Sequence, residues 1–142
     1  MKKQLILTLL VFLLIGCVWE SKSESKVDQS LMDENLAYLI VLVVEDGVIE
    51  YRLTNDSDEA LLYSSKVTIE EKSNNKWYAL DLKPNMAFDA KAYNLSPNNE
   101  TVQYFKYNEY YGDLKPGDYR IVVEIGKDLS KPEYLVGTFK VE

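Results

Sequence analysis

The fold of this chain is decided by one stretch, Tyr111-Gly112-Asp113-Leu114-Lys115-Pro116-Gly117-Asp118-Tyr119-Arg120-Ile121-Val122-Val123. Pro116 fixes its own φ, and we expect Gly117 to adopt a backbone conformation that other residues avoid, so the two predict a turn. A strand follows, and its apolar side chains recur at every second position. The residues expected to point inward are Tyr119, Ile121, Val123 and Ile125. Arg120 falls on the other face, so we expect Arg120→Ala to cost roughly 0.5 kcal/mol or less.

The same stretch predicts a tyrosine corner. A tyrosine that follows a Leu-x-Pro-Gly turn and begins a core strand is typical of β-sandwiches. The residues of this structural corner are Leu114, Pro116, Gly117 and Tyr119. The ring of Tyr119 is expected to pack in the core, and its hydroxyl to bond the backbone near Asp113 or Leu114.

The chain around the corner is a series of short apolar runs separated by turn residues. Residues 37–44 predict a strand that is buried over most of its length. Asp46-Gly47 predicts a hairpin turn, and 94–99 predicts a loop. The register of the strand at 101–107 stays open, because both of its faces carry aromatic residues. No run has the helical period, so residues 37–142 predict an all-β, antiparallel immunoglobulin-like β-sandwich of seven or eight strands.

A resemblance supports this interpretation. The corner stretch is similar to the signature near the C-terminus of a family of bacterial immunoglobulin-like domains, found in secreted and lipid-anchored proteins. Three further pieces fit in order, namely Ile49–Asn55, Lys76–Tyr78 and Gly137–Val141. The resemblance extends over residues 37–142 and implies the fold. It brings no catalytic residues with it.

The first residues predict export and a lipid anchor. Residues 1–16 have the anatomy of a lipoprotein signal peptide, with Lys2 and Lys3 before an apolar run that is too short to span a membrane. The run ends Leu14-Ile15-Gly16-Cys17, which resembles the lipobox of bacterial lipoproteins. We expect Cys17 to be lipidated and to become the new N-terminus, on the extracytoplasmic face of the cell membrane. The alternatives are an ordinary signal peptide with a chance cysteine, or an uncleaved anchor.

Residues 17–36 predict a flexible tether between the lipid and the domain. Serines and charged residues dominate positions 20–26, and such a composition buries too little apolar surface to become ordered.

Composition excludes several classes of function. The formal net charge is −7, so the chain repels phosphate backbones, and nucleic acid is not an expected partner. Anionic lipid would repel it too, so we expect the membrane to be reached through the lipid on Cys17. The chain has no histidine, the usual general base and metal ligand. With one cysteine, no disulfide can form within the chain.

No motif for catalysis or for a cofactor is present. The nucleophile motif Gly-x-Ser-x-Gly is missing. The 23 acidic residues leave a hydrolase that uses surface carboxylates as an unlikely alternative of another class. Residues 56–59, Asp-Ser-Asp-Glu, have oxygen ligands but lack the remaining positions of a calcium loop. We therefore predict no enzyme, no metal and no cofactor.

The candidate binding residues are the tyrosines before the corner, Tyr104, Tyr107, Tyr110 and Tyr111. Because side chains alternate along a strand, some of these tyrosines are expected to point outward. Exposed tyrosine suits a binding surface because it is large, amphipathic and loses little entropy when it is ordered. The competing interpretation, which the sequence favours, is that they only form cross-strand pairs. The expected function is a monomeric lipid-anchored extracytoplasmic module that binds an unknown protein or ligand non-covalently. The alternative is an inhibitor or immunity-type protein of an extracytoplasmic enzyme.

Overall fold

The computed structural model describes residues 22–27, 36–89 and 91–142. The predicted signal peptide and Cys17 lie outside these residues. The described chain forms strands and one single-turn helix, which are, in order, β1 (Ala37–Glu45), β2 (Val48–Asn55), β3 (Leu61–Ser73), β4 (Lys76–Ala79), β5 (Ala92–Leu95), β6 (Asn99–Phe105), α1 (Tyr107–Tyr110), β7 (Gly117–Gly126) and β8 (Glu133–Val141). Among the residues described, no helix is long and apolar enough to cross a membrane.

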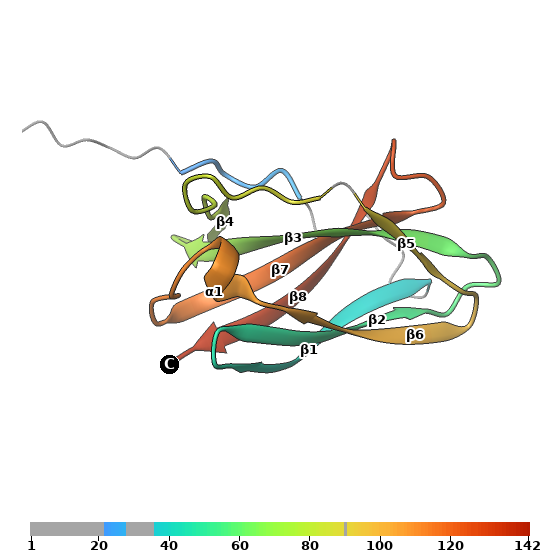
Figure 1. The fold of residues 1–142 in the computed structure, drawn as a ribbon, viewed down its shortest axis with the longest axis horizontal. Helices are drawn as coiled ribbons and strands as arrows, with labels where there is room; N and C mark the ends of the chain where they lie inside the picture. Colours follow the sequence, from blue (N-terminus) through green and yellow to red (C-terminus); the bar gives the residue numbers. More distant parts are fainter. Residues whose placement is uncertain (1–21, 28–35, 90) are drawn as a thin grey trace, which may run out of the picture.

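The strands form two sheets that face each other as two layers (Figure 1). The smaller sheet has the order β1-β2-β6. The larger sheet has the order β4-β3-β7-β8, and β5 also pairs with β3. All of these pairings are antiparallel. The predicted all-β antiparallel sandwich is therefore confirmed.

The core between the sheets is produced by the alternation of side chains along the strands. The four β7 residues predicted to point inward, Tyr119, Ile121, Val123 and Ile125, are all buried. They meet inward side chains of the facing sheet, among them Ile49, Tyr51 and Leu53 of β2. The register predicted for the strand after the corner is confirmed.

The predicted Asp-Gly hairpin joins β1 to β2. Asp46 and Gly47 both have positive φ, 50° and 79°. Two consecutive residues of this kind match the right-handed twist of the paired strands, which explains why the turn residues are Asp and Gly.

The prediction for β1 is wrong in one respect, because the strand is not buried over most of its length. Ile40, Leu42 and Val43 are 41%, 40% and 39% exposed. The outer face of the smaller sheet is open to solvent on β1 and on β6, so only the inner face of β1 meets the core. A bulge between Val41 and Val43 shifts the register and turns an extra apolar side chain outward.

Two further local predictions are wrong. The loop predicted at 94–99 begins as β5, which pairs with β3 and buries Leu95 in the core. The strand predicted at 101–107 ends at Phe105, which points inward, and residues 107–110 form helix α1. Four residues are too few to show a helical period in a sequence.

β1 and β8 close one side of the sandwich. A Cβ at Gly137 of β8 would collide with the Leu39 side chain of β1 and press on Val41. Glycine therefore lets the two strands approach closely without displacing the Leu39 side chain.

Candidate functional site

A buried ion pair lies on the outer face of the larger sheet. Arg120 of β7 and Glu70 of β3 are direct partners in the antiparallel register. Arg120 Nε donates to Glu70 Oε2 at 2.5 Å, and the two side chains are 2% and 4% exposed. Both positions alternate with inward residues, so the pair faces away from the core.

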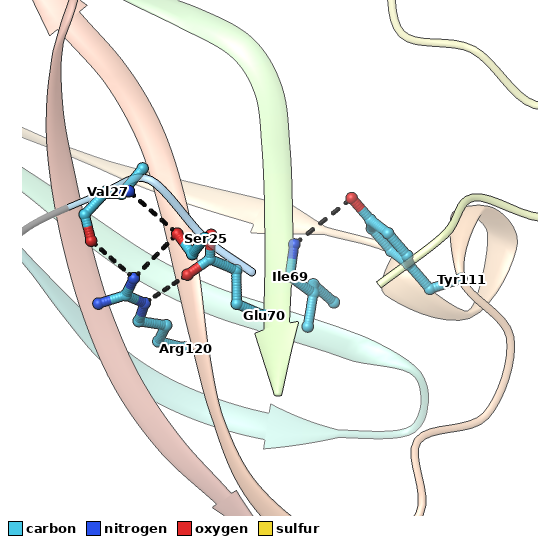
Figure 2. A network of polar contacts seen from close by, with 6 residues as sticks. All are labelled: Ser25, Val27, Ile69, Glu70, Tyr111 and Arg120. Carbon is cyan, nitrogen blue, oxygen red and sulfur yellow. Dashed lines mark hydrogen bonds and ion pairs between the residues drawn. The ribbon is translucent and has the colours of Figure 1, made fainter. Parts of the chain in front are cut away.

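The guanidinium group is covered from two directions. Its carbon lies 4.7 Å from the centre of the Trp77 ring of β4, a distance at which the ring face attracts a cation. From above, Arg120 Nη2 donates to Ser25 Oγ at 3.2 Å and to the backbone oxygen of Val27 at 3.0 Å (Figure 2). The cation is therefore removed from water and is hydrogen-bonded at the same time.

The chain that covers Arg120 from this side is residues 22–27, called here the N-terminal segment. It runs beside β4 and is the blue stretch of Figure 1. The Ser25 N–H donates to the Trp77 oxygen at 2.8 Å, and the Ala79 N–H donates to the Ser23 oxygen at 3.2 Å. These bonds form an antiparallel bridge on the edge of the larger sheet.

Two ion pairs accompany the backbone contacts of the N-terminal segment. Lys22 Nζ lies 2.7 Å from Glu71 Oε2, and Lys76 Nζ lies 3.0 Å from Glu24 Oε2. Residues 22–27, which belong to the tether predicted for 17–36, are therefore docked on the sheet in this structure. Composition did not predict this contact, because the partner of these polar groups is a distant sheet edge.

The expectation that Arg120 points into solvent is wrong, although its face was predicted correctly. The alternation places it opposite to Tyr119, but the outer face of the sheet is covered there. Sequence analysis did not identify Glu70, Trp77 or Ser25 as its partners. The available signal was that Glu70 and Arg120 carry opposite charges on the outward faces of two core strands.

The tyrosine corner is present. Tyr119 Oη donates to the Lys115 oxygen at 2.6 Å, which is the carbonyl directly after Leu114 and so lies in the predicted region. The ring stacks on Phe139 of β8, with centroids 5.6 Å apart. Burial raises the pKa of the Tyr119 hydroxyl, so the group stays a donor at neutral pH.

The other corner residues have simpler roles. Leu114 packs against the core, and Pro116 is exposed. Gly117 begins β7 without a positive φ, so the expectation of an unusual backbone conformation there is wrong. The glycine with a positive φ near the corner is Gly112, at 80°.

Two of the candidate binding tyrosines close the end of the sandwich. Tyr110 stacks on Phe88 with centroids 4.6 Å apart. Tyr111 Oη donates to the Val67 oxygen at 3.0 Å. It also accepts from the Ile69 N–H at 3.4 Å, the contact drawn in Figure 2. Burial raises the pKa of Tyr111 to about 12. These two rings hold α1 against β3 and the core.

The other two tyrosines are placed differently. Tyr107 is partly buried against the core. Tyr104 is 69% exposed on β6. The one-turn helix separates them, because it redirects the chain directly after the strand. A binding role for any of the four remains a prediction, and Tyr104 is the one most open to a partner.

Tyr104 belongs to a continuous outer surface of the smaller sheet. The register places Val43, Glu50 and Tyr104 in one row, and Ile40, Arg52 and Val102 in the next. We call this surface the small-sheet face, defined by Ile40, Val43, Glu50, Arg52, Val102 and Tyr104. Its apolar members are exposed. A row of apolar and aromatic side chains in water is a feature of interaction surfaces.

The acidic turn at 56–59 lines an open hollow of about 570 Å³ at the other end of the sandwich. Two acids of this turn already have partners, since Glu59 pairs with Lys127 and Asp58 accepts from Asn98. Among residues 22–27, 36–89 and 91–142, no three His, Cys, Asp or Glu side chains are grouped to hold a metal ion.

Comparison with known proteins identifies a family for most of the chain. A family model described as a bacterial Ig-like domain matches residues 41–137. A search of the curated proteins finds none that matches. The matched range includes the small-sheet face except for Ile40, and both partners of the buried ion pair. The N-terminal segment lies outside it.

Proposed function

Because the chain belongs to the bacterial Ig-like domain family, we propose that it is a lipid-anchored, surface-associated module that binds a protein non-covalently. Ig-like domain families are generally non-catalytic, which favours binding over chemistry. The lipid on Cys17 would hold the module on the extracytoplasmic face of the cell membrane. The support for the anchor is the run Leu14-Ile15-Gly16-Cys17 at the end of a short apolar segment.

Replacing Cys17 by serine is expected to abolish anchoring. Serine provides no thiol for acylation, so the protein should appear in the soluble fraction or remain as an unprocessed precursor. Cell fractionation and mass spectrometry of the N-terminus measure both outcomes. Normal processing together with membrane retention of Cys17→Ser would contradict the lipid anchor.

The observation that carries the binding proposal is the exposed small-sheet face. Its two outer strands, β1 and β6, present apolar side chains and Tyr104, and its central strand presents Glu50 and Arg52. Tyrosine is enriched at interaction hot spots because it offers large contact area at low entropic cost. Arg52 is paired with Glu100 on β6, which leaves Glu50 as the charge that a partner would meet. Charge complementarity therefore favours a protein partner whose apolar side chains surround a lysine or arginine.

Tyr104→Ala is expected to weaken the complex by about 2 kcal/mol, or roughly 30-fold in Kd, as for an aromatic hot spot. The partner is first captured in cells with a photo-crosslinking residue at position 104, then purified and titrated by calorimetry. Tyr93→Ala is the matched control, since Tyr93 is also exposed but lies on β5 of the other sheet.

Equal loss of affinity in both variants, or none in either, would exclude the small-sheet face as the binding surface. An extracytoplasmic enzyme as the captured partner, with its activity blocked in the complex, would identify an inhibitor or immunity-type protein instead.

A further inference from the structure

The N-terminal segment occupies an edge of the larger sheet in the way that an added strand does. β4 is the edge strand of this sheet, and Glu24 forms an antiparallel bridge with Tyr78. Main-chain hydrogen bonds to β4 hold the segment at Ser23 and Ser25. One side chain of the sheet, Arg120, donates hydrogen bonds to Ser25 and Val27 of the segment. This combination of backbone pairing and an anchoring side chain is the usual form of strand addition.

The contacts of the segment are suited to reversible docking. Its two ion pairs join side chains that are mostly in water, and such pairs add little stability. Only Ser25 and Val27 are partly buried, and the other residues of the segment are exposed. The few hydrogen bonds gained are opposed by the conformational entropy lost when six residues become ordered. The segment is therefore held by a small number of contacts, of which those to Arg120 are the most buried.

The position of the segment matters because it lies between the proposed lipid and the domain. When the segment is docked, the chain from Cys17 to Lys22 spans at most ~17 Å. When it is released, the chain from Cys17 to Leu36 spans about 24 Å root-mean-square and up to ~65 Å when extended.

We propose that residues 22–27 act as a reversible strap that sets the reach of the domain. Docked on β4 and Arg120, the strap holds the domain within one short length of chain from the lipid. Lys22 lies at the end of the sandwich that carries α1 and the tyrosine corner, where it borders a hollow with Lys115 and Tyr119. Docking therefore turns this end of the sandwich toward the membrane. Release of the strap lets the domain move farther from the membrane and rotate relative to it. The proposal rests on the lipidation of Cys17.

The test variant is Ser25→Pro in the mature full-length protein. Proline has no N–H for the Trp77 oxygen and no hydroxyl for Arg120, so it removes two contacts of the strap. Lys26→Pro is the matched control, because Lys26 is exposed and makes none of the strap's hydrogen bonds described above. A second test variant combines Lys22→Glu with Glu24→Lys and leaves the backbone unchanged. It places a negative charge beside Glu71 and a positive charge beside Lys76, so both ion pairs become repulsive.

Docking itself is measured without lipid. Hydrogen exchange at the Ala79 amide, which donates to Ser23, is expected to accelerate at least tenfold in both test variants and to stay unchanged in Lys26→Pro. Unchanged exchange in the test variants would overturn the strap. Protection that depends on protein concentration would also overturn it, in favour of segments exchanged between two copies.

Reach is measured with the lipidated protein on a supported bilayer. Neutron reflectometry is expected to place the protein layer farther from the bilayer in both test variants than in the wild type or Lys26→Pro. Equal layer heights would overturn the control of reach, even if exchange at Ala79 changes. A wild-type protein that does not attach to the bilayer would refute lipidation and the control of reach together, and the exchange result would still report docking separately.

Discussion

Arg120→Ala is expected to destabilise the protein by about 3–5 kcal/mol, because it leaves the Glu70 carboxylate buried without its partner. The total stability of a small domain is only about 5–15 kcal/mol, so a large part of it would be lost. This replaces the small effect expected when Arg120 is assumed to be solvated. Urea denaturation of the mature chain measures the change in the free energy of unfolding.

Two variants make this test specific to burial. Arg52→Ala removes another strand arginine whose ion pair with Glu100 is partly exposed, and it should cost about 0–1 kcal/mol. The double change Arg120→Met and Glu70→Leu removes both buried charges and should recover most of the lost stability. If Arg120→Ala is no worse than Arg52→Ala, the N-terminal segment does not cover the ion pair in solution.

Tyr119→Ala should cost about 3–5 kcal/mol, since it removes a large buried ring and leaves a cavity in the core. The ring is 2% exposed and stacks on Phe139. Tyr119→Phe keeps the ring and removes only the hydrogen bond to Lys115, so about 1–2 kcal/mol should be lost. The same urea titrations separate the two contributions.

The control for this pair is Tyr104→Ala, which changes an exposed tyrosine and should alter the free energy of unfolding by roughly 0.5 kcal/mol or less. Equal losses in Tyr119→Phe and Tyr119→Ala would mean that the hydroxyl, and not the ring, stabilises the corner. That outcome would contradict the packing described for the core.

The parts of the fold that were predictable are those determined by local chemistry. Alternation of apolar residues identified the inner face of β7, because a strand with one buried face must alternate. Asp46 and Gly47 identified a hairpin, because few other residues accept positive φ in succession. The Leu-x-Pro-Gly turn located the tyrosine corner and the region of backbone that accepts the hydroxyl's hydrogen bond.

The parts that were not predictable depend on which surfaces meet. The apolar run of β1 predicts burial, but the outer face of the smaller sheet lies in water. The polar residues 22–27 predict a flexible tether, but a sheet edge satisfies some of their backbone groups. Arg120 is buried because Trp77 and that distant segment both cover it. None of these contacts is local, so no window of sequence contains both partners.

The close approach of β1 and β8 has a consequence for how the chain folds. A free, strongly apolar edge strand such as Ala37–Glu45 is a template for aggregation. β8 is the last strand in sequence, so every earlier strand can be in place while the edge near Leu39 and Val41 is still open. Contacts between such distant segments form slowly. The nascent domain therefore remains prone to self-association until its final strand emerges, and Gly137 allows that strand to seal the edge.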